Sequence, residues 1–194
     1  MPPKIKITKE SIVECALTLV REEGGQALNA RAIAAALNCS TQPIFSNFAT
    51  MEALQEATLA AAYERYFCFI KSEVESQKYP PYKAFGMAYV RFAKEEKELF
   101  RFLFMRDRRG EDLSPSSDFE ESVQMIMKAN DVTKETAMLM HMELWVCVHG
   151  IATLLVTSFL PIEWELVSDM LTDVYQGIRA RHVSEEKSYE SNSN

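Results

Sequence analysis

Apolar side chains recur every three to four positions along most of this chain, which is the spacing that places them on one face of an α-helix. The first such stretch begins at Thr8, a residue suited to cap a helix, and stops at the glycine pair 24–25. Its apolar face consists of Ile12, Cys15, Ala16, Leu19 and Val20. The pattern therefore predicts a helix over about 8–23.

Two short helices follow, separated by a turn of three residues. Asn29 can cap the first, which runs to Leu37, and the second spans about 41–48. Pro43 lies in the first turn of that second helix, where its missing N–H has no partner within the helix anyway. The side chains expected to form a small shared core are Ile33, Ala34, Leu37, Ile44 and Phe48.

The remainder of the chain also has helical patterns and no convincing strand. A long helix is predicted over about 50–75, and further helices over 82–94, 96–105, 118–129, 134–159 and 163–181. The fold class is therefore all-α, with about nine helices. The expected domains are a tri-helical N-terminal domain (1–49), a larger helical domain (50–183) and a disordered tail (184–194).

Composition and charge agree with a helical protein that has one mildly basic end. Only six glycines and seven prolines occur in 194 residues, which favours long helices over a turn-rich β architecture. The net charge is −7, yet residues 1–48 carry five Lys or Arg against four Glu, a net charge of +1. A basic end on an acidic body suits a protein that binds DNA in one orientation.

Several functional classes have no support in the sequence. There is no glycine-rich phosphate loop, nucleophile elbow or zinc-protease motif, so we expect no enzyme activity and no cofactor. We expect no metal site, because the four cysteines form no C-x-x-C pair. They are interpreted as free thiols of a reducing compartment, with a redox sensor as the alternative. We expect a cytoplasmic protein, because we find neither a signal-peptide core nor an unbroken apolar run of about 18 residues.

The two short helices, with the helix before them, match the tri-helical helix-turn-helix pattern of DNA-binding proteins. In that motif the N-terminal turn of the last helix presents side chains to base edges in the major groove. Here that turn offers Ser40, Thr41 and Gln42, which can hydrogen-bond, and Pro43, whose ring can pack on a thymine methyl. Asn47 follows, within reach of phosphate.

The run LNARAIAAALNCSTQPIFSNFATMEALQEA (28–57) resembles the N-terminal signature of the TetR-like regulators, the tetracycline-repressor family. The resemblance covers residues 8–57 well and continues more faintly at 99–105 and 145–154. It implies that Arg31 contacts base or phosphate. It further implies base contacts by Thr41, Gln42 and Pro43, backbone contacts by Phe45 and Asn47, and a DNA-binding arm of Lys4, Lys6 and Lys9.

Three positions depart from that signature. The turn has Asn38 where the family usually has glycine, Met51 stands where a lysine is common, and Phe45 lacks the hydroxyl of the usual tyrosine. The last two changes remove groups that contact phosphate. We therefore expect DNA binding that is weaker and less salt-dependent than in a typical member.

The larger domain is rich in methionine and aromatic residues. Any single one of these side chains is better interpreted as core, but as a group they exceed what a compact core needs and suit a pocket for varied apolar ligands. His141, Trp145 and His149 recur every four residues and share one helix face, either as polar groups of a pocket or as structural histidines. The predicted ligand-binding residues are Tyr63, Phe67, Met87, Phe100, Phe104, Met105, Met138, His141, Met142, Trp145 and His149.

By this resemblance the chain is a repressor that a small, largely apolar molecule releases from DNA. Helix-turn-helix regulators bind two half-sites, so we expect a palindromic double-stranded operator and a homodimer formed through the last two helices. Two apolar stripes are candidates for that contact: Leu144, Val148, Ile151 and Leu155; and Val167, Met170, Leu171, Val174 and Ile178. The alternative is a helical ligand-binding or protein-interaction module whose tri-helical end does not contact DNA.

Overall fold

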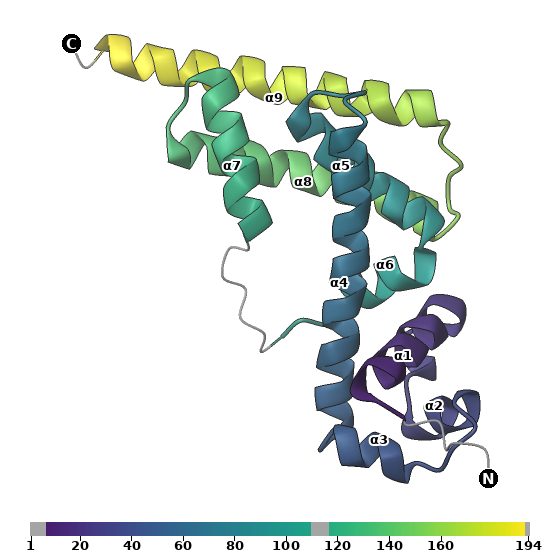
Figure 1. Cartoon of the computed structure of the whole chain (residues 1–194). Helices are drawn as coiled ribbons and strands as arrows, with labels where there is room; N and C mark the ends of the chain where they lie inside the picture. Colours follow the sequence, from purple (N-terminus) through teal and green to yellow (C-terminus); the bar gives the residue numbers. More distant parts are fainter. Residues whose placement is uncertain (1–6, 110–116, 193–194) are drawn as a thin grey trace. The chain divides into compact units, whose positions relative to one another are not determined.

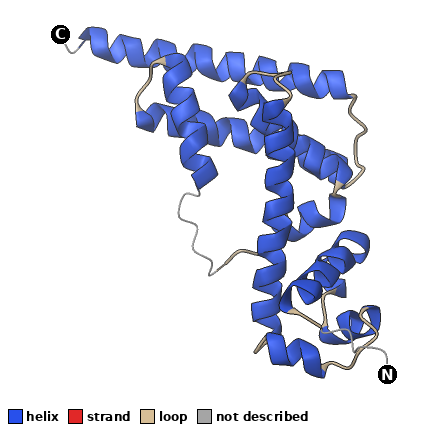
Figure 2. Cartoon of the chain, viewed as in Figure 1, coloured by secondary structure: helices blue, strands red, loops and turns tan. Residues whose placement is uncertain are grey.

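The computed structural model describes residues 7–109 and 117–192, with 117–118 and 185–192 described by their backbone alone. Within these residues the chain forms nine α-helices, one short 3-10 helix and no strand (Figure 2). The all-α prediction is therefore confirmed. The elements are α1 (Lys9–Glu23), η1 (Gly25–Ala27), α2 (Ala30–Ala36), α3 (Gln42–Asn47), α4 (Met51–Glu75), α5 (Pro81–Glu95), α6 (Lys97–Phe104), α7 (Ser117–Asn130), α8 (Lys134–Val156) and α9 (Trp164–Asn192).

Contacts between residues divide the chain into two compact units. Unit 1 comprises residues 1–68 and 95–107, and unit 2 comprises 69–94 and 108–194. The part of α4 up to Cys68 and all of α6 therefore group with the three N-terminal helices. A functional boundary after residue 49 stays a prediction.

Local capping sets the start of the first two helices of unit 1. The Thr8 hydroxyl accepts a hydrogen bond from the Ser11 amide (3.2 Å) while Ser11 Oγ accepts one from the Thr8 amide (3.0 Å). Such a reciprocal pair satisfies backbone donors that the helix leaves without partners. The Asn29 side chain caps α2 by accepting from the Ala32 amide at 2.9 Å, as its position predicted.

A single apolar core joins α1, α2, α3 and the start of α4, which lie together in Figure 1. Its buried side chains are Ile12, Ala16, Ile33, Ala34, Ile44, Phe48 and Leu54. The α2–α3 turn places Asn38 at φ 49°, a left-handed conformation that asparagine tolerates better than most residues. The departure from glycine at this position is thus compatible with the turn.

Unit 2 is built on α8, which packs against α7 and α9. One core lies between α7, α8 and α9, and includes Val123, Ile126, Met140 and Leu144. The other joins α5 to α8 and α9 through Met87, Val90, Ile151, Val167 and Leu171.

The two stripes assigned to the dimer contact instead pack inside unit 2. Ile151, Val167 and Leu171 are buried in the core around Met87, with Val148, Leu155 and Met170 packed against it. Leu144 is buried in the other core, against which Val174 and Ile178 pack. The assignment of the buried Leu144, Ile151, Val167 and Leu171 to a dimer contact was wrong, because helical periodicity shows an apolar face without showing what covers it.

Helix α8 is long and apolar enough, by length and composition alone, to cross a membrane, and no other helix among the described residues is. A core helix passes the same test. Ala137, Met140 and Leu144 of α8 are buried within unit 2, and Glu143 in its middle accepts a hydrogen bond at 3.1 Å from His182 of α9. One side of α8 is therefore packed within unit 2, and the charged side chain in its middle has a partner there.

Helix α9 continues to Asn192, beyond residue 181, where the apolar pattern ends. It therefore includes most of the segment that the sequence assigned to a disordered tail. The side chains described in its last part end at Ser184.

Candidate nucleic-acid interface and ligand site

Helix α3 divides its side chains between the core of unit 1 and solvent. Ile44 is fully buried and Phe48, at the C-cap, is 3% exposed, so this six-residue helix is fastened by its inner face. Ser40, Gln42 and Asn47 are exposed, Thr41 and Pro43 are partly exposed, and Phe45 is 49% exposed. The predicted base-contacting residues Thr41, Gln42 and Pro43 are therefore at least partly accessible to solvent.

The outer surface of α3 has no charged side chain, because no Asp, Glu, Lys or Arg occurs between Arg31 and Glu52. Arg31 is exposed at the start of α2. Lys9 Nζ lies 5.2 Å from the centroid of the Phe48 ring, which places this ammonium beside the end of α3. Lys4 and Lys6 lie outside the described residues.

Two polar side chains of α3 bond back to their own helix. Ser46 Oγ donates to the Gln42 carbonyl at 2.9 Å, and Asn47 Nδ2 donates to the Pro43 carbonyl at 2.8 Å. Asn47 thus uses part of its amide locally. Gln42, at the first position of the helix, has an exposed side chain aimed away from the core.

The departures at positions 45 and 51 have different structural settings. Met51 begins α4 and packs against the core of unit 1, so its side chain contributes to packing. Phe45 instead presents an apolar ring to solvent on the outer surface of α3. Packing within the subunit does not explain why an aromatic ring occupies this exposed position.

Five of the eleven predicted ligand-binding residues belong to unit 1. Phe104 of α6 meets Tyr63 and Tyr66 of α4 edge-on, with ring centroids 6.0 and 5.3 Å apart, and lies 5.2 Å from Phe100. Phe67 extends this α4–α6 ring cluster, which we define as Tyr63, Tyr66, Phe67, Phe100 and Phe104. Phe67 and Met105 are each 41% exposed, whereas Phe100 is fully buried.

The other six belong to unit 2 and do not share one environment. Met87 is fully buried in the core between α5, α8 and α9. Met138, Met142 and Trp145 lie on an exposed face of α8. His141 and His149 face α5, where each meets a tyrosine.

These histidines form two matching pairs with α5. The Tyr82 hydroxyl lies 3.0 Å from His141 Nδ1, and the Tyr89 hydroxyl 2.9 Å from His149 Nδ1. Burial lowers the pKa of both histidines, which favours the neutral ring, and burial raises the pKa of the Tyr82 hydroxyl, which stays protonated. A neutral imidazole that accepts at Nδ1 from a tyrosine is a structural arrangement.

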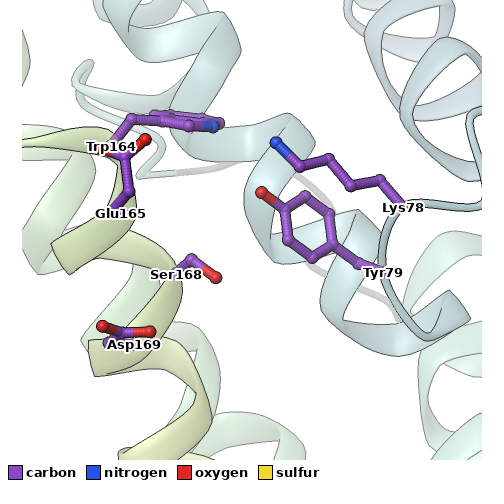
Figure 3. A pocket seen from close by; sticks show the side chains of 6 residues that line it. All are labelled: Lys78, Tyr79, Trp164, Glu165, Ser168 and Asp169. Atoms are coloured by element: carbon purple, nitrogen blue, oxygen red, sulfur yellow. The ribbon is translucent and has the colours of Figure 1, made fainter.

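A small open cavity of about 200 Å³ lies elsewhere in unit 2. Figure 3 shows Lys78 and Tyr79, from the segment after α4, facing residues of the first turns of α9. Lys83 adds its ammonium beside the Tyr79 ring and donates to Ser168 Oγ at 2.8 Å. None of the eleven predicted residues lines this cavity, whose lining is Lys78, Tyr79, Trp164, Glu165, Ser168 and Asp169.

Comparisons with known proteins show which proteins this chain resembles. Residues 82–175 match the family described as tetracyclin repressor-like, C-terminal domain. Over residues 82–175 the chain is therefore TetR-like. None of the curated protein sequences compared matches it.

Solved structures of this family share the fold. A TetR family member from Streptomyces coelicolor A3 superposes with a TM-score of 0.61 at 19% identity, over 86% of this chain and 96% of that one. The multidrug binding protein EbrR, complexed with imidazole, gives a TM-score of 0.59 at 19% identity, over 86% of this chain and 93% of that one.

In this TetR-like chain several side chains pair with residues far away in the sequence, and the sequence does not predict these pairs. Tyr82 and Tyr89 are the partners of the two histidines, 59 and 60 residues away. Glu96, at the α5–α6 junction, binds two arginines of other helices. Glu96 stands within the charged run KEEKE (94–98), so nothing in the sequence distinguishes this acid from its exposed neighbours.

The Tyr–His pairs predict a pH dependence of stability. Both histidines have a lower pKa in the folded state than their ordinary value of 6.5, so the folded protein binds fewer protons than the unfolded chain. The free energy of unfolding should therefore decrease as the pH falls below 6.5. Urea unfolding followed by tryptophan fluorescence should give a lower unfolding free energy at about pH 5.5 than at about pH 7.5. The double variant His141→Gln/His149→Gln should have a flatter profile, and an unchanged pH dependence in that variant would contradict this origin.

Proposed function

We propose that this TetR-like protein is a cytoplasmic, dimeric DNA-binding transcriptional repressor that a small apolar ligand releases from its operator. The observation that carries the proposal is the exposed, uncharged polar turn of α3, fastened to unit 1 through buried Ile44. A rigid short helix that presents Gln42 outward suits contact with base edges, since glutamine pairs with adenine N6 and N7 in the major groove. The fold of TetR-family regulators supports a transcriptional regulator.

The ring cluster of α4 and α6 is the proposed effector site. Five rings in edge-on, tilted or stacked contact offer flat apolar faces, and the exposed Phe67 and Met105 provide a route from solvent. Flat rings and a thioether adapt to varied apolar ligands. The similarity to EbrR, a multidrug binding protein, supports a small-molecule effector for this fold.

The proposed dimer contact is the outward face of α8 and α9, opposite the stripes buried in unit 2. Leu139 and Val146 are 57% and 56% exposed on α8, and Leu166 is 52% exposed on α9. A Cβ built on Gly150 or Gly177 would meet nothing within 4 Å, so both glycines border open space where a partner helix could approach closely. Apolar side chains exposed in this number suit a protein interface.

Selection of bound duplexes from a random pool tests the proposal. The full-length protein should enrich an inverted repeat whose half-sites are about one helical turn apart, since a two-fold dimer presents its recognition helices that way. Sedimentation should give twice the chain mass of 22.1 kDa. Enrichment of no sequence, by a protein that is folded, would favour the ligand-binding or protein-interaction module instead.

Phe45 predicts the salt dependence of that binding. Each phosphate that the protein neutralises contributes about −0.9 to the slope of log K against log salt, so a protein that binds fewer phosphates should show a shallow slope, above about −6. Phe45→Tyr restores a hydroxyl on an exposed ring and should steepen the slope by about 0.9 for each phosphate that this hydroxyl brings to the protein. Equal slopes for the two proteins, measured by titration at several salt concentrations, would contradict a backbone contact at position 45.

A further inference from the structure

Glu96 lies at the meeting point of three helices of unit 1. It occupies the N-cap position of α6, and its side chain is only 3% exposed. One carboxylate oxygen, Oε2, accepts from Arg21 Nε of α1 at 2.6 Å. The other, Oε1, accepts from Arg65 of α4, at 2.9 Å from Nε and 2.6 Å from Nη2. Each oxygen therefore fastens a different helix.

The burial of this ion cluster is unequal. The two guanidinium groups reach solvent, with side chains 51% and 41% exposed, whereas the carboxylate between them does not. Removing a carboxylate from water is unfavourable unless its charge is compensated. Loss of the ion pairs should therefore destabilise the buried Glu96 carboxylate more than the two solvent-exposed guanidinium groups. A shift of α6 against α1 or α4 would uncover the acid or break one of the bonds.

The three helices that meet at Glu96 have distinct places in unit 1. Arg21 lies in the last turn of α1, whose other turns supply Ile12 and Ala16 to the core that carries α3. Arg65 directly precedes Tyr66 of the ring cluster on α4, and Phe100 of that cluster follows Glu96 by one turn of α6. Glu96 thus links the proposed effector site to the helix under the recognition helix.

A second contact ties α6 to the end of α1. A Cβ on Gly25 of η1 would lie 2.9 Å from Cδ2 of the Phe102 ring, so this glycine allows the ring to approach the backbone directly. The last turn of α1 and the following η1 are therefore held by α6 both through an ion pair and through close packing. The end of α1 therefore depends on the position of α6.

We propose that Glu96 is a positioning residue that sets the placement of α1 relative to α4, and through it the spacing of DNA half-sites that the dimer accepts. The claim about half-site spacing rests on the proposed function. The claim about the placement of α1 rests on the ion cluster alone. A ligand between the rings of α4 and α6 would lie close to Arg65 and Glu96 in the sequence of these helices, so it would disturb their ion pair.

Hydrogen–deuterium exchange of the full-length protein tests the structural part without DNA. A glutamine amide at position 96 can accept from one arginine only, and its NH2 group faces the other. Glu96→Gln should therefore accelerate exchange in residues 17–23 and 62–68, while residues 134–156 stay unchanged. The matched control is Glu75→Gln, which breaks an exposed pair on α4 with Lys71 and should leave both segments unchanged.

Operators with the spacer lengthened or shortened by one base pair test the DNA part. The wild-type protein should prefer the selected spacing, and Glu96→Gln should reduce that preference at least about fivefold, as expected for a coupling between sites. Arg21→Gln, which leaves Glu96 paired with Arg65, should show the same loss if Glu96→Gln does not fold. A merely structural role would instead lower affinity equally for all spacings.

The outcomes separate the two proposals. If Glu96→Gln accelerates exchange only in the two segments and the wild-type protein enriches no duplex, the proposed regulator function is contradicted but the positioning role of Glu96 is retained. Uniformly faster exchange throughout unit 1, no change in exchange, or a retained spacing preference in both variants would overturn the role of Glu96.

Discussion

Replacing Gln42 with alanine should cost the protein about 1–3 kcal/mol of discrimination at one base pair in each half-site, a loss of about 5- to 150-fold. Gln42 is exposed at the first position of α3, and its backbone carbonyl is already engaged by Ser46, so truncation removes a contact group without disturbing the helix. Affinities for the selected operator and its single-base variants, measured by fluorescence anisotropy at one salt concentration, give the loss directly.

The control for this variant is Gln124→Ala, which truncates an exposed glutamine on α7 and should leave operator affinity and base preference unchanged. Gln42→Ala should also keep its affinity for random duplex, because phosphate contacts supply sequence-independent binding. A variant that discriminates bases as well as the wild type would show that Gln42 contacts no base.

Ile44→Ala should destabilise unit 1 by about 2–5 kcal/mol, the usual range for removing a large aliphatic side chain from a core. Ile44 is fully buried, and α3 has only six residues, so few other contacts compensate. The amides of residues 9–48 should exchange correspondingly faster, and operator binding should be lost because the recognition helix is no longer fastened.

The neighbouring substitution Phe45→Ala provides the comparison. Phe45 is 49% exposed on the same helix, so its truncation should cost well under half of the stability lost with Ile44→Ala. Similar losses for the two variants, or a loss below about 1 kcal/mol for Ile44→Ala, would contradict the burial pattern on which the exposed surface of α3 depends.

The features that could be predicted from sequence depend on neighbours in the chain. Thr8 and Asn29 cap α1 and α2 because a cap bonds to amides three residues away, which a local pattern contains. The inner residues Ile44 and Phe48 follow from helical spacing. The TetR resemblance was strongest over residues 8–57, whereas the family match covers residues 82–175, so the two lines of evidence fall on different parts of the chain.

The features that could not be predicted depend on residues far apart in sequence. Glu96 pairs with Arg21 and Arg65, which are 75 and 31 positions away, and no periodicity relates them. The same limit explains the dimer stripes: Ile151 and Leu171 have the spacing of an apolar face, but their burial within unit 2 depends on which helix lies opposite. An interaction partner is a tertiary property that amphipathic patterns leave open.

Operators in which one adenine at a time is replaced by 7-deazaadenine test the central claim most directly, because this base lacks the N7 acceptor that a glutamine amide contacts. The wild-type protein should lose affinity at one adenine in each half-site, and Gln42→Ala should bind the same modified and unmodified operators equally. If both proteins lose affinity at that adenine to the same extent, the turn of α3 does not contact base edges through Gln42, and the account of this TetR-like protein as a sequence-specific repressor is contradicted.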